Sequence, residues 1–547
     1  MKNYLLLIAC FGCVTCSKTD TPQPIAGNFN LTSIKINSFQ NTGNTVFNVN
    51  YNPVIEISFN APVDQLTVNS NITLDPSVPF SVSYSNNDSN LIIQPTTTLL
   101  PLRKYQVNVL TALKSVSGTN LFAQGSAGFI TQIDSTDKFP QLTDSILLDL
   151  VQQQTFKYFW DFGHPVSGMA RERNTSGDLV TTGGTGFGIM AIPVAIKRNF
   201  ITRAEGLARA LQIVNFYQNN CIPFHGAFAH WINGATGATI PFSNDDNGAD
   251  LVETSYLMQG LITARQYFSS AIDANEIALR TGINQLYDAV EWSWFRKAGE
   301  NVLYWHWSPN MGFVINAQVR GWNEALITYV MAASSQTDAI PNIVYNNGWA
   351  NNGNIVNNNT YYGYQLPLGP SNGGPLFFEH YSFLGINPNG LTDAYANYQN
   401  QAINHTKINY EYCKANPRGW NGYSNVCWGL TASDVPNGYN ANEPNNDPGV
   451  IAPTAALSSM PYSPTESMAA LKFFYYKLGD KLWGQYGFYD AFKLSDPWFA
   501  SSTLAIDQGP IIIMIENYRS GMLWELFTSA PEVRAGMINL GFSAPYL

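Results

Sequence analysis

The stretch S-I-L-L-D-L-V-Q-Q-Q-T-F-K-Y-F-W-D-F, residues 145–162, marks the point where the sequence becomes helical. Its apolar residues recur every three to four positions, which is the period of one helix face. The same period returns along the rest of the chain, in segments 187–198, 203–218, 250–268, 274–295, 323–334, 391–412, 464–478 and 510–527. Long Gly- and Asn-rich stretches separate some of these segments, at 342–375 and 415–460.

Roughly 400 residues of paired helices with long loops predict an alpha/alpha toroid, in which inner helices line a central cavity. Loops at one end of such a scaffold would build the site. Periodicity alone does not separate a toroid from an alpha solenoid. The lack of a fixed repeat of about 34 or 40 residues favours the toroid.

Upstream of residue 140 the pattern is that of β-strands. The runs I-E-I-S-F (55–59), S-V-S-Y (81–84), L-I-I-Q-P (91–95) and Y-Q-V-N-V-L (105–110) are separated by Asn, Asp, Ser, Gly and Pro. This spacing is typical of a small β-sandwich, which we predict over residues 28–133. The region also resembles the Ig-like domains of bacterial surface proteins. We expect a spacer or packing role for it, and carbohydrate binding is the alternative.

The first residues, M-K-N-Y-L-L-L-I-A-C-F-G-C-V-T-C-S-K-T-D, read as a secretion signal. The segment resembles a bacterial lipoprotein signal, in which a cysteine becomes the lipidated first residue. We predict a signal peptide over 1–16, lipidation at Cys16 and a polar tether over 17–27. Cys10 is the alternative, but it leaves a very short apolar run. The chain is therefore expected in the bacterial cell envelope, held to the membrane by lipid alone. The sequence does not indicate which membrane face carries it.

The composition narrows the class of partner. The chain has 547 residues, 13% aromatic and 12% charged, with a net charge of −10. A negative chain repels phosphate backbones and anionic lipid, so we expect no nucleic-acid binding. Low charge with many aromatic residues suits a neutral partner with apolar faces and many hydroxyls, such as a sugar polymer. We predict a monomer.

Three cysteines remain beyond the signal, namely Cys221, Cys413 and Cys427. The C-x-x-C spacing of a zinc site is absent among them, so no metal is predicted. Cys413 and Cys427 either form a disulfide in an oxidising envelope or stay buried thiols.

Carboxylates gather in S-N-D-D-N-G-A-D-L-V-E-T-S-Y-L-M-Q-G-L, residues 243–261. Asp250 and Glu253 are three apart and share one helix face, and Asp246 precedes them by a turn. Helix capping is an equal explanation for Asp246 or Asp250. Glu253 fits capping less well, because a Glu inside an apolar helix is costly without a partner. A cavity wall with water or substrate hydroxyls would remove that cost.

Two further segments carry acids. Glu324 begins a helix after the aromatic-rich loop L-Y-W-H-W, with Trp305 and Trp322 nearby, and a cap with core tryptophans is the alternative. In L-A-I-D-Q-G-P-I-I-I-M-I-E-N-Y-R, Asp507 stands just before a helix and Glu516 inside it. Asp507 is either a cap or a site residue. Glu516 is either a substrate contact or the partner of Arg519.

Four motifs carry a resemblance: F-F-E-H-Y-S-F-L-G-I-N-P (377–388), V-C-W-G-L-T-A-S-D (426–434), I-A-P-T-A-A-L-S-S-M-P-Y-S-P-T-E-S (451–467) and I-E-N-Y-R-S-G-M-L-W (515–524). Together they resemble the glycoamylase-like family, which includes the endo-β-1,2-glucanases of glycoside hydrolase family 144, over residues 140–547. The resemblance implies an all-α (α/α)6 barrel after the Ig-like sandwich. It also implies hydrolysis of β-1,2-glucan to short sophoro-oligosaccharides, with inversion and no cofactor.

The resemblance implies five important acids: Asp246, Asp250, Glu253, Glu324 and Asp507. An inverting glycosidase needs one protonated acid and one carboxylate that activates water. We predict Glu324 as general acid, because surrounding aromatics would desolvate it, and Asp507 on the base side. Asp250 and Glu253 either hold hydroxyls or relay a proton. Proposed substrate contacts, each with a packing role as the alternative, are Asp246, Trp305, Trp322, His380, Tyr381, Trp428, Asp434 and Glu516.

Two other functions stay open at this point. One is hydrolysis of a different glucan. The other is a surface lipoprotein that binds glycan without cleaving it. The presence of all five acids argues against this alternative, because binding alone does not require them. Internal or end-on cleavage and the length of the product are also open.

Overall fold

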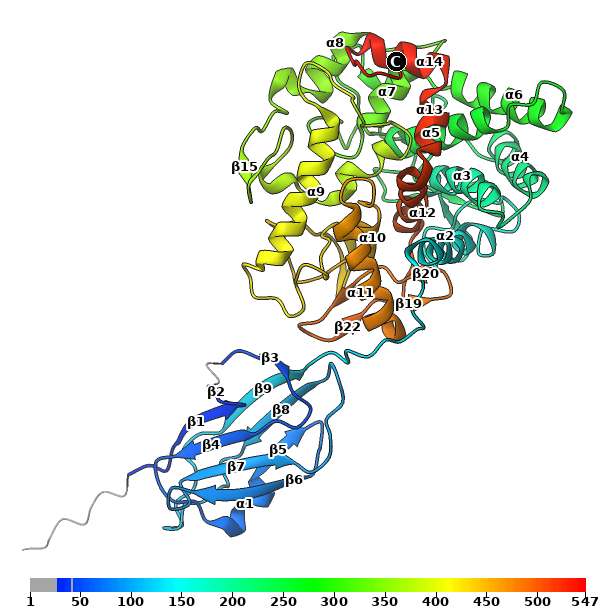
Figure 1. Ribbon diagram of the computed structural model, residues 1–547. Coiled ribbons are helices and arrows are strands. Elements are labelled where there is room, and N and C mark those ends of the chain that lie inside the picture. Colours follow the sequence, from blue (N-terminus) through cyan, green and yellow to red (C-terminus); the bar gives the residue numbers. More distant parts are fainter. Residues whose placement is uncertain (1–26, 41–42) are drawn as a thin grey trace, which may run out of the picture. The chain divides into compact units, whose positions relative to one another are not determined.

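The computed structural model of the chain describes residues 27–40 and 43–547 (Figure 1). These residues divide into two compact units, with the division between Gln132 and Ile133. The predicted signal peptide, the lipidated Cys16 and all but the last residue of the tether lie outside the described residues, and they stay predictions. Among the described residues, no helix combines the length and the apolarity that a bilayer span requires.

The first unit is a sandwich of two sheets, with strand orders β2-β1-β4-β7-β6 and β3-β9-β8-β5. Its elements are β1 (Leu31–Ile36), β2 (Phe39–Gln40), β3 (Val46–Val49), β4 (Ile55–Phe59), α1 (Gln65–Asn71), β5 (Ile72–Asp75), β6 (Phe80–Ser85), β7 (Asn90–Pro95), β8 (Lys104–Val109) and β9 (Gly125–Thr131). In β4, Ile55, Ile57 and Phe59 are buried while the residues between them are partly exposed. Alternation of this kind places one side of each sheet in the shared core, so the predicted sandwich is confirmed.

The second unit is largely helical, as predicted. Its α-helices are α2 (Asp144–Trp160), α3 (Thr182–Lys197), α4 (Arg203–Asn219), α5 (Leu251–Tyr267), α6 (Ala274–Asp288), α7 (Leu326–Ser334), α8 (Asn342–Val344), α9 (Tyr398–Ala415), α10 (Pro453–Leu457), α11 (Pro464–Leu482), α12 (Ala505–Ser520), α13 (Met522–Thr528) and α14 (Pro531–Asn539). Single turns of other helix types are η1 (Trp292–Arg296), η2 (Tyr345–Trp349), η3 (Asn351–Gly353), η4 (Ser371–Gly373), η5 (Leu376–Glu379) and η6 (Ser382–Leu384).

Short strand pairs join the loops of this unit. They are formed by β10 (Leu179–Thr181), β11 (Trp231–Asn233), β12 (Thr239–Ile240), β13 (Ala249–Asp250), β14 (His306–Trp307), β15 (Thr360–Tyr361), β16 (Tyr364–Gln365), β17 (Ala432–Val435), β18 (Gly438–Ala441), β19 (Trp483–Gly484), β20 (Gly487–Phe488), β21 (Phe492–Lys493) and β22 (Trp498–Phe499). The pair of β13 and β14 matters for function, because it ties the acidic segment to the W-H-W loop.

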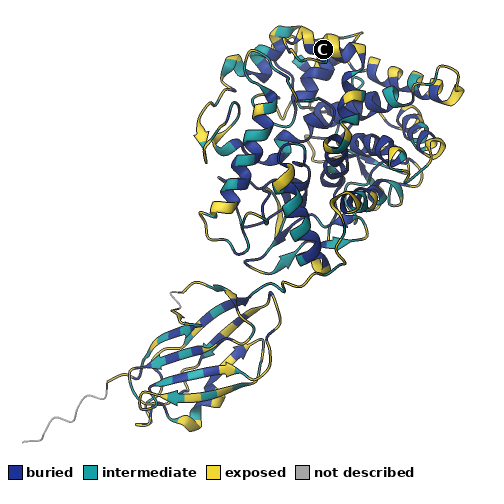
Figure 2. Cartoon of the chain, viewed as in Figure 1, coloured by how far each residue is buried: buried dark blue, intermediate teal, exposed yellow. Residues whose placement is uncertain are grey.

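Helices α3, α5, α7, α10 and α12 form the interior of the helical unit. Helix α3 packs against α5 and α12, α5 packs against α7, and α10 packs against α12. Nearly every residue of these helices is buried, and they are dark blue in Figure 2. A helix that is buried on all sides belongs to the interior. Helices α2, α4, α6, α9 and α11 mix buried and exposed residues, as outer helices do.

Several predicted helix bounds are wrong. Helix α3 begins at Thr182 and not at residue 187. The prediction missed its first residues because T-G-G-T-G shows no apolar period. Its small residues allow close packing: a Cβ on Gly186 would lie 2.3 Å from the backbone oxygen of Tyr256 in α5. The predicted helix over 510–527 is two helices, α12 and α13, separated by Gly521 with a left-handed φ of 68°. The prediction over 391–412 begins too early, since α9 starts at Tyr398.

Cys221, Cys413 and Cys427 are buried free thiols. Of the two alternatives for Cys413 and Cys427, the structure therefore has the thiols and not the disulfide. Burial raises the pKa of all three thiols, to about 12 for Cys221. A thiol with so high a pKa is a poor nucleophile, so these cysteines act as small apolar side chains.

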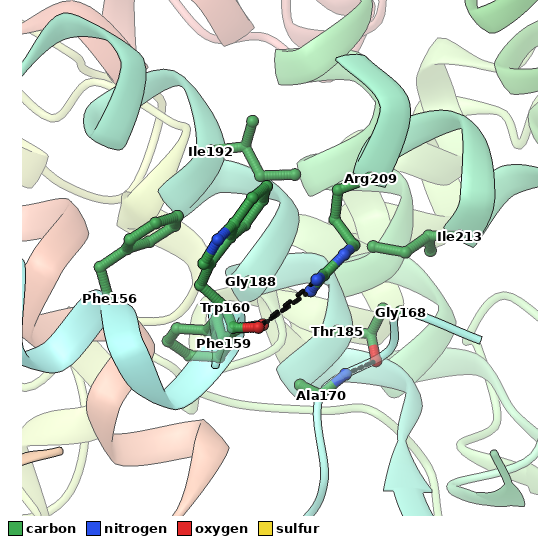
Figure 3. Close-up of a pocket in the computed structure, with 10 residues that line it drawn as sticks. All are labelled: Phe156, Phe159, Trp160, Gly168, Ala170, Thr185, Gly188, Ile192, Arg209 and Ile213. Carbon is green, nitrogen blue, oxygen red and sulfur yellow. Dashed lines mark hydrogen bonds between the residues drawn. The ribbon is translucent and has the colours of Figure 1, made fainter. Parts of the chain in front are cut away.

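The contact between α2, α3 and α4 leaves almost no free space (Figure 3). The void there measures about 10 Å³, which is at most the room for one water molecule. The guanidinium of Arg209 lies over the Trp160 ring, 4.5 Å from its centre, and donates to the backbone oxygen of Phe159 at 3.3 Å. This region is therefore packed interior and not a ligand site.

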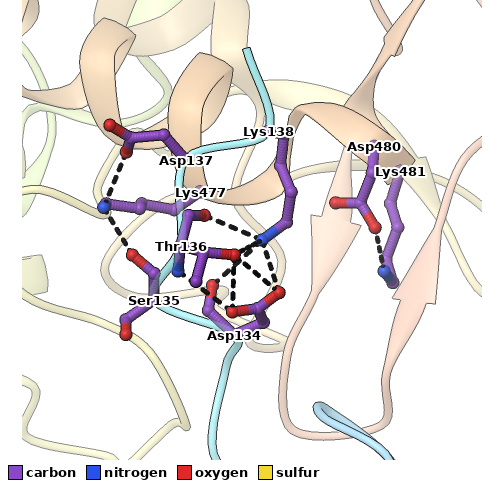
Figure 4. A network of polar contacts seen from close by, with 8 residues as sticks. All are labelled: Asp134, Ser135, Thr136, Asp137, Lys138, Lys477, Asp480 and Lys481. Carbon is purple, nitrogen blue, oxygen red and sulfur yellow. Dashed lines mark hydrogen bonds and ion pairs between the residues drawn. The ribbon is translucent and has the colours of Figure 1, made fainter. Parts of the chain in front are cut away.

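Residues 134–142 lie along α11 at the start of the helical unit (Figure 4). Lys477 Nζ binds Asp137 at 2.8 Å and donates to the backbone oxygen of Ser135 at 2.6 Å. The Phe139 ring stacks on Tyr475 with ring centres 4.6 Å apart. A Cβ on Gly479 would approach the Phe139 ring to 2.4 Å, so this glycine makes room for the ring. The segment before α2 is thus packed as part of the helical unit.

Candidate active site

The predicted acids lie at the N-terminal ends of interior helices. Asp250 caps α5, and its carboxylate accepts a hydrogen bond from the Glu253 N–H at 2.9 Å. Asp507 lies in the first turn of α12, and not before the helix as predicted. Glu324 stands two residues before α7, whereas the sequence predicts it as the first helical residue. A helix N-terminus stabilises negative charge, so each acid has a favourable position.

Glu253 is buried in the interior of the unit. Its Oε2 accepts from the Gly183 N–H at 2.6 Å and from the Thr181 hydroxyl at 3.2 Å. A Cβ on residue 183 would lie 2.6 Å from that oxygen, so only glycine allows the approach. Burial raises the pKa of Glu253, and the charge of Asp250 adds to the rise. The carboxyl group that the sequence left unpartnered is therefore held by the start of α3.

Two histidines complete the acidic cluster. The pairing of β13 with β14 sets Asp250 opposite His306, whose Nε2 is 3.6 Å from Asp250 Oδ2 and 3.5 Å from Asp246 Oδ2. His230 Nδ1 lies 3.1 Å from the same oxygen of Asp250. We call these four residues and Glu253 the acid–histidine cluster, which consists of His230, Asp246, Asp250, Glu253 and His306.

The charges of the cluster are coupled. Burial alone would lower the pKa of His230, but Glu253, Asp250 and Asp246 outweigh it and raise the value to about 9. Burial would raise the pKa of Asp250, but the two histidines hold it well below its usual range. Burial raises the pKa of Asp246. The sequence reasoning missed both histidines, although the chain has only six and His306 stands in the W-H-W loop.

Glu324 is the most acid-like of the predicted residues. Burial raises the pKa of its carboxyl group to about 7, and the charges of Asp250 and Glu253 contribute. The side chain nevertheless keeps some accessible surface. A pKa near the working pH is what a general acid needs.

Tyr381 connects Glu324 to Asp507. Burial raises the pKa of Tyr381 well above its usual value, and the charges of Asp507 and Glu324 both add to the rise. Its ring packs 5.8 Å from the ring of Tyr256, which also responds to Glu324, Glu253 and Asp250. Asp250, Glu324 and Asp507 therefore all lie near these two tyrosine rings.

Asp507 has its own group of charged neighbours. Burial raises the pKa of Asp507 well above its usual range, and the charges of Asp490 and Asp434 add to it. Asp434 pairs with Arg173 at 3.3 Å, and Arg173 also pairs with Glu172 at 3.0 Å. Asp490 and Arg173 were missed, because neither stands in a segment with a clear period.

A pocket of about 570 Å³ opens beside this group. Asp434, Arg173, Tyr439 and Trp498 line it, together with residues 174–175 and 499–502. Tyr439 is 49% exposed, yet burial raises its pKa well above the usual value, with Asp507 adding to the rise. A side chain that is both accessible and enclosed stands inside a deep recess. The volume falls in the range of small-molecule sites.

The structure contradicts four predicted substrate contacts. Trp428 is fully buried, and its indole N–H donates to the Glu466 backbone oxygen at 3.3 Å. His380 is 1% exposed, lies 3.0 Å from the Ser459 hydroxyl, and burial lowers its pKa to about 3. Trp322 is buried and donates to Glu379 at 3.2 Å. These three residues pack the helical unit, which is the alternative that the sequence left open.

Glu516 is the fourth predicted substrate contact that lies in the protein interior. It is fully buried and accepts two hydrogen bonds from Arg198, at 2.7 and 2.9 Å, with Lys197 at 3.6 Å. Arg519, its predicted partner, binds Asp149 instead at 2.6 Å. Glu516 therefore joins α12 to α3 as a structural ion pair. Trp305 is partly exposed and its ring stacks on His306, whereas Asp246 is buried within the acid–histidine cluster.

We expect Glu516→Gln to lower the free energy of unfolding of the helical unit by about 2–3 kcal/mol, because it leaves the Arg198 charge without its partner. All Trp residues lie beyond residue 159, so Trp fluorescence in a urea titration reports this unit alone. The matched control is Glu411→Gln, which removes an exposed pair with Lys414 and is expected to change stability by less than about 0.5 kcal/mol. Equal stability of the two variants would contradict the structural role.

Comparison with known proteins shows the family of each unit. The family model described as "Putative glucoamylase" matches residues 316–531, and a bacterial Ig-like domain model matches residues 32–131. An exo β-1,2-glucooligosaccharide sophorohydrolase (non-reducing end) of Parabacteroides distasonis is 46% identical over 430 residues. That match covers 74% of this chain and 59% of the relative, so the chain spans less than two thirds of the relative's length.

Two solved structures extend the comparison. An endo-β-1,2-glucanase of Chitinophaga pinensis, in complex with sophorotriose and glucose, is 50% identical with a TM-score of 0.73 and covers 74% of this chain and 100% of that one. A β-1,2-glucanase of Parabacteroides distasonis is 37% identical with a TM-score of 0.71 and covers 93% of this chain and 72% of that one. The chain belongs to the glycoamylase-like family, with a bacterial Ig-like domain before the helical domain.

Proposed function

We propose that the helical unit hydrolyses β-1,2-glucan or its oligosaccharides. The observation that carries the proposal is the Glu324 carboxyl group, whose pKa burial raises to about 7, together with Asp507, which like Glu324 raises the pKa of the buried Tyr381. One acid that keeps its proton and one that takes a proton from water are the two parts of an inverting glycosidase. The relatives named above act on β-1,2-glucan or β-1,2-glucooligosaccharides.

The interior helices support a ring arrangement. We infer that the unit closes into an (α/α)6 barrel, with α3, α5, α7, α10 and α12 and the η5–η6 segment as its inner helices. The acids at the starts of α5, α7 and α12 then share one mouth. A substrate that enters this mouth meets Glu324 on one side and Asp507 on the other.

The mechanism follows from these positions. Glu324 gives its proton to the glycosidic oxygen as the bond to the anomeric carbon breaks. Asp507 and its neighbours take a proton from the water that attacks the opposite face of the sugar. The charges of Asp250 and Glu253 act on Glu324 and favour its protonated form. No cofactor takes part in this scheme.

The substrate is tested by incubating the full chain with β-1,2-glucan, starch and β-1,3-glucan and measuring reducing ends. We expect release from β-1,2-glucan at least about a hundredfold faster than from the other two, since positioned acid catalysis alone is worth that factor. Equal or faster release of reducing ends from starch would support the alternative function, hydrolysis of a different glucan. Binding of β-1,2-glucan without any release would support the glycan-binding lipoprotein. Chain lengths over time separate internal from end-on cleavage.

The pKa of Glu324 predicts an alkaline limb in the pH profile. The general acid works only while it holds its proton, so kcat/KM is expected to fall as the pH rises through about 7. Initial rates on β-1,2-glucan between pH 5 and 9 measure this limb. A rate that stays constant to pH 9 would contradict the assignment of Glu324 as the acid.

A further inference from the structure

Asp490 forms a buried pair with Asp507 that the proposed mechanism has not used. The two residues are 3% and 2% exposed. The two carboxyl groups lie close enough to interact directly, and each keeps one buried oxygen, Asp490 Oδ1 and Asp507 Oδ2, without a hydrogen-bond partner among the described residues. Asp490 is fixed from the other side, because its Oδ2 accepts from the Asp434 backbone N–H at 2.6 Å and its own N–H donates to the Ser502 backbone oxygen at 3.0 Å.

A hydrogen bond between two carboxyl groups requires a proton. An ionised carboxylate only accepts, so two ionised groups cannot bond to each other. Among the described residues, no N–H or O–H group of another residue reaches Asp490 Oδ1 or Asp507 Oδ2, and both oxygens are buried. A proton on one of the two acids, accepted by the other, would satisfy both of these buried oxygens.

The surroundings do not supply positive charge for two ionised groups. The charged and titratable groups that face the pair are Arg173, Tyr381, Asp434 and Tyr439. Arg173 is the one cation among them, and it is already bound to Glu172 and Asp434. Two carboxylates that share a buried site keep one proton between them, because both cannot ionise at such a short distance.

We propose that Asp490 is a positioning residue: it shares one proton with Asp507, and the pair, rather than Asp507 alone, takes the proton of the attacking water. This inference rests on the proposed function. The water oxygen bonds to the anomeric carbon while the glycosidic bond breaks and Glu324 protonates the leaving oxygen. The water proton passes to Asp507, and the proton of Asp507 moves to Asp490. Loss of one proton to solvent and reprotonation of Glu324 restore the starting state.

The test replaces Asp490 by Asn, which keeps an oxygen for the Asp434 N–H and removes the charge. In the natural chain the acid limb of kcat/KM is expected at the pKa of Asp490, which burial raises to about 6. In Asp490→Asn, Asp507 loses its like-charged neighbour and gains an amide donor, and both effects lower its pKa. We expect the acid limb to move to lower pH by about one unit or more. Asp490→Ser, which also removes the charge, is expected to shift it in the same direction.

The matched control is Asp447→Asn. Asp447 is a buried acid of the same unit, 4% exposed, and accepts from the hydroxyls of Tyr412 and Tyr423 at 3.0 and 2.8 Å. Its replacement is expected to lower stability and to leave the acid limb in place. An unchanged limb in the Asp490 variants, whatever their kcat, would reduce Asp490 to a structural role and overturn the proposal.

A second readout needs no substrate. An acid whose pKa is raised in the folded state binds more protons folded than unfolded, so the folded protein loses stability as the pH rises through that pKa. For the pair this loss begins above about pH 4 and continues through about pH 6. The Tm of the helical unit, followed by Trp fluorescence from pH 5 to 8, is expected to fall less steeply in Asp490→Asn than in Asp447→Asn. Equal slopes would overturn the shared proton. If the natural chain cleaves no β-1,2-glucan, the proposed function is overturned instead, and with it the transfer of the water proton to the Asp507–Asp490 pair.

Discussion

Glu324→Gln is expected to lower kcat on β-1,2-glucan by about 10²- to 10⁴-fold, which is the usual worth of a positioned general acid. The amide keeps the size of the side chain and carries no transferable proton. The loss is expected to shrink strongly on a dinitrophenyl sophoroside, because that leaving group departs without protonation. Initial rates on the two substrates measure this difference.

Folding of the Glu324 variant is not expected to suffer. Burial and the charges of Asp250 and Glu253 raise the pKa of Glu324 to about 7, so ionisation above that pH costs the folded state stability. The amide removes this cost, and the Tm at pH 8 is expected to equal or exceed that of the natural chain. Glu525→Gln, on an exposed position of α13, is the control for both readouts. A Glu324→Gln enzyme that keeps more than about a tenth of its rate would contradict the acid role.

Asp507→Asn is expected to lower kcat by a similar factor of about 10²- to 10⁴-fold, but through the water step. The reason is that Asp490 receives the proton only through Asp507, so its remaining carboxyl group does not replace the missing base at the water. A better leaving group is not expected to restore the rate, in contrast to Glu324→Gln. Azide needs no deprotonation, so it is expected to restore part of the rate and to form an α-glycosyl azide.

The two variants together separate acid from base. Rates on glucan, on the dinitrophenyl substrate and with added azide give each variant a distinct pattern. Rescue of Asp507→Asn by the leaving group, and of Glu324→Gln by azide, would show that the two roles are exchanged. Rescue of neither by either treatment would contradict a direct role in proton transfer.

The sandwich and the outer helices could be predicted from the sequence because each has a clear period. The inner helices are harder to place, because α3 and α12 are buried on all sides and begin in segments rich in Gly, Thr and Ala. In α3, Gly186 lies against the backbone of Tyr256 in α5. No local sequence pattern predicts a contact between residues so far apart in the chain.

The acids of the site could be predicted, and several of their partners could not. Asp250 and Glu324 were found because carboxylates are rare in this chain and stand at helix starts. His230 reaches Asp250 through a loop, and Asp490 reaches Asp507 from a strand connection, so only the fold brings them together. The errors have the same origin. Trp428 and Glu516 have the residue types of a sugar site, but their partners, Glu466 and Arg198, make them part of the packing.

The most direct test of hydrolysis between Glu324 and Asp507 is the configuration of the first product. Proton NMR of the natural chain acting on β-1,2-glucan, recorded before mutarotation, is expected to show the α-anomer at the new reducing end, because water attacks the face opposite the broken bond. A first product in the β-configuration would contradict a mechanism in which Glu324 protonates the leaving oxygen and Asp507 activates the water.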